Sequence, residues 1–146
     1  MIRYLFAIGF MAAGLCAAAT TTVLAQTPPS GVDKKRIAVS ENIQKSVIQI
    51  VGAQEKTVEV TIRGNILTVV RVNSNLNDST HGARNNEAIA IASVVTKAIE
   101  DSPKLKDVHT IRVQYLARRD SAAKDIVLDT VDFRKDSNGK FQFHET

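Results

Sequence analysis

Polar side chains that could bind a ligand gather in residues 73–87, between two stretches with regular apolar spacing. Amides, carboxylates, an imidazole and a guanidinium occur there together, which favours hydrogen-bonded recognition, and long polar loops in compact domains are often functional. The candidate binding residues are Asn75, Asn77, Asp78, His81, Arg84 and Glu87. In the alternative interpretation, the Asn, Asp and Ser side chains only satisfy backbone groups in turns and cap the next helix.

A calcium loop is not expected in this segment, although Asn73, Asn75 and Asn77 stand at alternate positions as the leading ligands of such a loop do. The motif requires glycine at its sixth position and glutamate at its twelfth, where this chain has Asp78 and Arg84. The histidines of the chain also lack the short spacing that is typical of zinc ligands. We therefore predict no metal ligands and no cofactor.

The sequence carries no pattern that names a reaction. His144 lies opposite Asp132 in a predicted C-terminal hairpin, but an exposed Asp–His pair is usually a cross-strand contact, and no nucleophile accompanies it. The chain has neither a Gly-rich phosphate loop nor a GxSxG turn. We predict no catalytic residues and a protein that is not an enzyme. A small hydrolase or inhibitor that acts through residues 73–87 is the alternative.

The first 25 residues have the pattern of an export signal. Arg3 supplies a positive start, residues 5–19 are apolar, and Val23, Leu24 and Ala25 fit a signal-peptidase site that places the cut before Gln26. The apolar run is short for a membrane anchor. Lipidation of Cys16 is not expected, because a bulky leucine precedes it where that processing needs a small residue. We predict a protein that acts in the periplasm or outside the cell.

Removal of residues 1–25 would change the composition of the chain. All of its sulfur lies in that segment, so the remaining chain could form neither a disulfide nor a thiolate metal site, and its fold would depend on core packing. It would keep 18 basic residues against 15 acidic ones, a net charge of +3. Nucleic-acid binding needs a concentrated basic surface, and these charges are spread along the chain. We therefore predict no nucleic-acid partner.

The elements that must position the polar segment can be read from the periodicity. A first helix is expected to end at Gly52 and to begin at a cap formed by Ser30 or Asp33. Its apolar stripe comprises Ile37, Ser40, Ile43, Val47, Ile50 and Val51. A second helix is predicted over residues 83–101, with its stripe at Ala88, Ile91, Ala92, Val95, Ala98 and Ile99, and with Ile89 and Val94 widening the apolar surface.

Period-two patterns predict five strands. Residues 58–63 and 66–72 form a hairpin around Gly64 and Asn65, in which Ile62 faces Leu67. The other strands are predicted at 108–116, 126–134 and 140–144, with Phe133 opposite Phe143, and with Val127, Val131 and Phe141 on one face. The fold class is α+β, with two helices on one face of a mainly antiparallel five-stranded sheet in the order αββαβββ. Residues 26–32 are a flexible linker and residues 33–146 a single domain.

The other face of this predicted sheet carries more aliphatic residues than a fully hydrated face needs, Ile126 and Leu128 among them. One interpretation is an ordinary scatter of apolar residues. The other is an interface with a protein partner or with a second copy of the chain, which would form a homodimer through the open sheet face. The candidate interface residues are Ile66, Val70, Arg112 and Leu116.

Residues 37–116 contain a helix, then alternating Val58, Val60 and Ile62 before a glycine turn, then an Ala-rich helix and a further strand at residues 108–116. In this pattern they resemble the BON domain of bacterial envelope proteins. The chain departs from that pattern in its long loop at 73–82 and in two extra strands after residue 120. The resemblance implies an exported module that associates with membrane surfaces and phospholipid, and it assigns no functional residue.

These observations predict a binding or interaction module of the cell envelope without catalytic activity. Its expected partner is an unidentified protein or a membrane surface.

Overall fold

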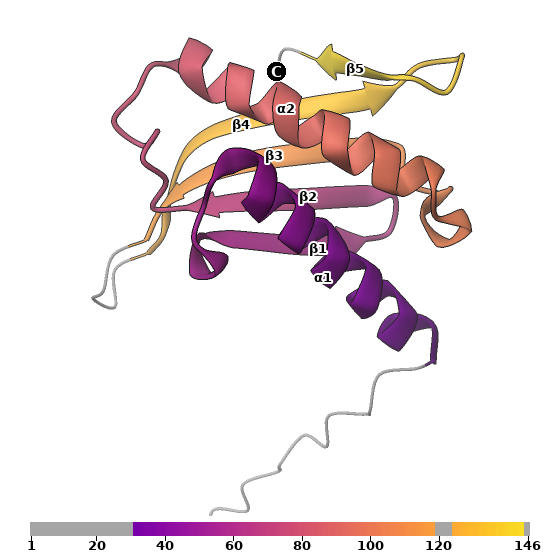
Figure 1. Cartoon of the computed structure of the whole chain (residues 1–146). Helices are drawn as coiled ribbons and strands as arrows, with labels where there is room; N and C mark the ends of the chain where they lie inside the picture. The colour runs from indigo at the N-terminus through magenta and orange to yellow at the C-terminus, as the bar shows by residue number, and fades with distance from the viewer. Residues whose placement is uncertain (1–30, 119–123, 145–146) are drawn as a thin grey trace, which may run out of the picture.

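The computed structural model describes residues 31–118 and 124–144 (Figure 1). The predicted export signal and most of the predicted linker lie outside these residues. The elements in chain order are α1 (Gly31–Val51), η1 (Glu55–Thr57), β1 (Val58–Arg63), β2 (Ile66–Val72), α2 (His81–Glu100), η2 (Pro103–Leu105), β3 (Thr110–Ala117), β4 (Ile126–Lys135) and β5 (Phe141–His144).

The five strands form one sheet in the order β1-β2-β3-β4-β5. Neighbouring strands are antiparallel except for β2 and β3, which are parallel because α2 carries the chain back across the sheet between them. Both helices pack on the same face of the sheet, as Figure 1 shows. The predicted α+β fold and its order of elements are confirmed.

The β1–β2 hairpin has the predicted register. Val60 pairs with Val69, and Ile62 pairs with Leu67. The turn needs a residue with positive φ, and Gly64 supplies it with φ of +58°. One side of the hairpin therefore faces the helices, where Leu67 and Val69 are fully buried.

Helix α1 buries a narrower stripe than predicted. Ile43 and Val47 are buried, but Ile37 is 47% exposed and Ile50 is also exposed. Ile50 lies seven residues after Ile43, on the same side of the helix, but it belongs to the last turn of α1, whereas Ile37 lies six residues before Ile43 and nearer the start of the helix. Gly52, with φ of +59°, follows the last helical residue as expected. The helix begins at Gly31, so the predicted cap Asp33 lies within it, and Ser30 is outside the described residues.

Helix α2 begins two residues earlier than predicted, because Thr80 is its N-cap and accepts a hydrogen bond from the N–H of Ala83. Its buried stripe is the predicted one, with Ile91 and Val95 fully enclosed. Ile89, expected to widen the apolar surface, is 52% exposed and does not belong to the buried stripe. The core between the sheet and the helices is built from Val47, Leu67, Val69, Ile91, Val95, Ile111, Val113 and Tyr115, among others.

A β-bulge in β4 changes the predicted face of its first residues. Tyr115 pairs with Asp129, whereas Leu116 pairs with Val127, so Leu128 is an extra residue in the ladder. Beyond the bulge the alternation shifts by one. Val127 therefore lies with Leu116 on the uncovered face and is exposed, and Ile126 moves to the other face, so both predicted placements are wrong. The predicted pairing of Phe133 with Phe143 is confirmed.

Candidate functional site

A groove of about 690 Å³ runs between α2 and the β4–β5 hairpin; it is called the aromatic groove below. Its position follows from the width of the layers, because a helix covers about two strands. Helix α1 contacts β1, and α2 contacts β3 and β4, which leaves β5 at the edge beyond the helices. The apolar lining comprises Ile89, Ala92, Phe133, Phe141 and Phe143, and Ser93, Thr96, Lys97, Glu100 and Asp101 supply its polar side.

One wall of the aromatic groove comes from α2, and the β4–β5 hairpin supplies the floor and the other wall. Phe133 is buried and forms the floor, while Phe143 from β5 is 45% exposed. Their rings meet edge to face, with centroids 6.0 Å apart, which is a favoured geometry for two aromatic rings. The ammonium of Lys135 lies 5.1 Å from the ring centroid of Phe141. Ile89 on α2 completes an apolar surface that remains open to solvent.

A smaller hollow of about 190 Å³ adjoins the aromatic groove, and Phe143 lines both. It is polar, since His81 and Asn85 at the start of α2 line it together with Asp129 and His144. His81 Nδ1 lies 2.7 Å from Asp129 Oδ2, and the amide of Asn85 lies 2.9 Å from His81 Nε2. The aromatic groove thus ends at a group of hydrogen-bonding side chains.

The ring of His81 is held by hydrogen bonds on both of its nitrogens. Both ring nitrogens of His81 are engaged, one by Asp129 and the other by Asn85. Within residues 31–118 and 124–144, no Ser or Thr hydroxyl hydrogen-bonds to this ring. In the same part of the chain, no three His, Cys, Asp or Glu side chains come together in a way that could hold a metal ion.

Arg84, a predicted binding residue, holds the polar loop in place. Its Nη1 donates to the carbonyl oxygens of Leu76, Asn77 and Ser79, and its Nε donates to Asp129 at 2.8 Å. Burial alone would raise the pKa of Asp129, but the hydrogen bonds from Arg84 and His81 outweigh it and lower that pKa. Asp129 therefore stays ionised, and the loop is fixed to β4.

Glu87, another predicted binding residue, pairs with an arginine that sequence reasoning missed. Arg71 on β2 is only 2% exposed, and its Nε lies 2.8 Å from Glu87 Oε1. Its other nitrogens contact the hydroxyl of Ser74 and the backbone oxygen of Thr57, each at 3.4 Å. The signal was present in the sequence, since Arg71 continues the inward-facing alternation of Leu67 and Val69. The pair joins β2 to α2 inside the domain.

The remaining predicted binding residues divide between surface and interior. Asn75 and Asp78 are exposed. Asn77 is half-buried, and its amide donates to the carbonyl of Leu116 at 3.2 Å, while its Oδ1 is buried without a hydrogen-bond partner in the described chain. Of the six candidates, His81 alone lines the hollow beside the aromatic groove.

Comparison with known proteins identifies no family for this chain. No family model, curated protein or solved structure matches the chain. None of the helices in the described part of the chain has the length and apolar character needed to cross a membrane.

The predicted interface residues lie on the sheet face that no helix covers, but they do not form one apolar patch. Ile66, Val70 and Leu116 are half-buried there. Arg112 lies between them and binds Asp132 with two hydrogen bonds of 2.8 Å. The hydrogen bond from Arg112 lowers the pKa of Asp132 more than burial raises it, so this carboxylate, 1% exposed, stays charged. Arg112 is thus occupied within the sheet.

Proposed function

We propose that this protein is a non-catalytic binding module that holds an apolar segment of a partner protein in the aromatic groove. The observation that carries the proposal is the pair of exposed side chains, Ile89 and Phe143, on opposite sides of an open groove with an aromatic floor. Apolar side chains gathered in a concave surface are typical of ligand and partner sites.

The ends and the rim of the groove support a protein segment as the ligand. The polar hollow at one end is lined by Asn85 and Thr130, whose amide and hydroxyl could hydrogen-bond to a bound chain and fix its orientation. The rim on α2 carries one basic residue, Lys97, beside the acidic Glu100 and Asp101. A mixed rim of this kind gives little attraction to an anionic lipid surface, whereas it can pair with the polar flanks of a peptide.

The proposed setting is the cell envelope or the extracellular space. It rests on the signal-like pattern of residues 1–25 and on the resemblance of residues 37–116 to an envelope module. Mass spectrometry of the protein recovered outside the cytoplasm should find Gln26 as the first residue. A retained residue 1–25 segment, or a lipid on Cys16, would contradict this expectation.

The groove can be tested with a fluorescent apolar probe, anilinonaphthalene sulfonate. We expect Phe143→Ser to weaken binding of the probe about tenfold, because it removes a ring shared by the groove and the adjoining hollow. The melting temperature should change little, since the side chain is nearly half exposed. The matched control is Gln142→Ser, which alters the neighbouring residue of β5 and should leave binding unchanged.

A second measurement separates a protein ligand from a lipid surface. A photo-crosslinking residue in place of Phe143 should capture a partner protein, while the same residue at position 142 should not. If vesicles of anionic phospholipid bind the chain and Phe143→Ser abolishes that binding, the groove is a lipid site. Equal probe binding by all variants would reject the groove as the site.

A further inference from the structure

Strand β1 is an edge of the sheet, and its outer backbone groups face away from the neighbouring strand. In a hairpin closed by a two-residue turn, the residues that flank the turn exchange backbone hydrogen bonds, and so does every second pair beyond them. The flanking pair is Arg63 with Ile66, so the odd-numbered residues of β1 bond to β2. The N–H and C=O groups of Val60 and Ile62 therefore point outward, where another strand could pair with them.

Three of the features that prevent strand pairing are absent from this edge. Edges are commonly blocked by a proline, a bulge or an inward-pointing charge. The inward residues of β1 are Val58, Val60 and Ile62, and the strand contains no proline and pairs with β2 without a register shift. In the described part of the chain, both outward groups of Val58 are engaged: its N–H donates to the carbonyl of Glu55, and its carbonyl accepts from the side-chain amide of Gln44 at 2.7 Å. The free edge is thus limited to the segment centred on Thr61.

The sequence of this segment is complementary to itself. We propose that two copies of the chain pair through β1 in antiparallel orientation, with the two-fold axis at Thr61. In that register Val60 faces Ile62 of the second copy, and their outward backbone groups can bond in both directions. Glu59 faces Arg63 of the second copy on the uncovered side, and the symmetry repeats this ion pair. A shift by two residues would keep the backbone bonds but lose both ion pairs.

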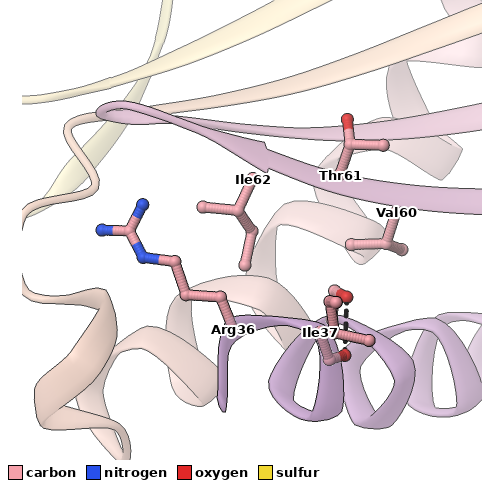
Figure 2. Close-up of a pocket in the computed structure, with 6 residues that line it drawn as sticks. Arg36, Ile37, Val60, Thr61 and Ile62 are labelled. Carbon is pink, nitrogen blue, oxygen red and sulfur yellow. Dashed lines mark hydrogen bonds between the residues drawn. The ribbon is translucent and has the colours of Figure 1, made fainter. Parts of the chain in front are cut away.

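The side chains beside the edge fit this arrangement. A groove of about 270 Å³ lies between α1 and β1, and Figure 2 shows Val60 and Ile62 pointing into it while Thr61 points away. Ile37 on α1 borders the groove and is 47% exposed. A second β1 strand would extend the sheet over this groove with its own Val60 and Ile62. Exposed apolar surface on α1 would then be covered.

The charges are available for the proposed contacts. Arg63 is exposed and has no ion pair in the described part of the chain. Glu59 pairs with Arg118 at 2.7 Å, but both side chains are more than two-fifths exposed, and the carboxylate can accept a second donor. The aromatic groove lies at the opposite edge of the sheet, so the dimer would leave two such grooves free. The inference therefore does not depend on the proposed function.

A charge exchange tests the register. Sedimentation equilibrium of the full chain should give twice the monomer mass. Glu59→Arg and Arg63→Glu alone should each weaken dimerisation about tenfold or more, because each places like charges opposite one another twice. The double variant should restore the wild-type dissociation constant to within about threefold, since the two pairs are re-formed with opposite polarity. Lys140→Glu, an equal charge reversal far from β1, should have no effect.

A cysteine scan tests the two-fold axis without relying on affinity. In a Cys16→Ser background, Thr61→Cys should form an intermolecular disulfide in mild oxidant, because side chains at a non-hydrogen-bonded antiparallel pair come close. Glu59→Cys should not, since the pairing places it opposite residue 63. The proposal is overturned if the chain is monomeric, if Glu59→Cys cross-links and Thr61→Cys does not, or if Val70→Asp dissociates the dimer while Glu59→Arg leaves it intact.

Discussion

Replacing Arg71 by alanine should lower the free energy of unfolding by about 3–5 kcal/mol, the typical cost of removing one partner from a buried ion pair. Arg71 is almost fully enclosed, and its guanidinium is the group that neutralises Glu87 inside the domain. Without it, the carboxylate of Glu87, with only 13% of its side chain exposed, would remain buried as an unpaired charge. Urea denaturation should show a lower midpoint at an unchanged slope.

Two further variants separate the buried charge from the loss of packing. Arg71→Met with Glu87→Leu should recover most of the lost stability, because two apolar side chains of similar length leave no charge unpaired. Arg118→Ala removes an arginine that has two ion-pair partners, Glu59 and Asp125, on the surface, and it should leave the midpoint almost unchanged. If Arg71→Ala and Arg118→Ala have equal effects, the Arg71–Glu87 pair does not contribute to the fold as argued.

Ile91→Ala should cost about 2–5 kcal/mol, because this side chain is fully buried at the centre of α2 and its truncation leaves a cavity among packed neighbours. The matched control is Ile89→Ala on the same helix. Ile89 is half exposed in the aromatic groove, so its truncation should cost less than about 1 kcal/mol. Similar losses from the two variants would mean that α2 turns a different face to the sheet.

Periodicity in the sequence was sufficient to predict the framework of this fold. The stripe through Ile91 and Val95 gives α2 its buried face, and the alternation around Gly64 gives the β1–β2 hairpin its register. Both patterns arise from contacts within one element or between adjacent ones, where the spacing of apolar residues is a direct consequence of geometry. The order of elements then restricts the sheet to few arrangements.

The errors concern features that depend on distant partners. The extra residue at Leu128 places Val127 on the opposite face of the sheet from the predicted one, and the local alternation of apolar and polar residues does not indicate this bulge. Ile37 and Ile50 match a helical stripe, but both are exposed, because the parts of α1 that are covered depend on how far the neighbouring elements extend beneath it. Glu87 was predicted as a surface ligand because its partner Arg71 is sixteen residues away in the sequence.

The aromatic groove could not be predicted from sequence either. Its walls belong to α2 and to a hairpin that ends near the C-terminus, and it exists because the sheet is wider than the helical layer. Phe133, Phe141 and Phe143 read as core residues in the sequence. Only the relative placement of the layers leaves one of them, Phe143, half exposed.

The coincidence of strand order with chain order has a consequence for how the protein folds. Each antiparallel pair joins strands that follow one another directly in the sequence, so its contacts can form at a small cost in loop entropy. The parallel pairing of β2 with β3 differs from these, because the segment of chain between the two strands contains all of α2. Non-local contacts of this kind slow folding. We therefore expect the β2–β3 pairing, in which Val69 lies beside Val113, to form late, after the β1–β2 hairpin and α2 have begun to form.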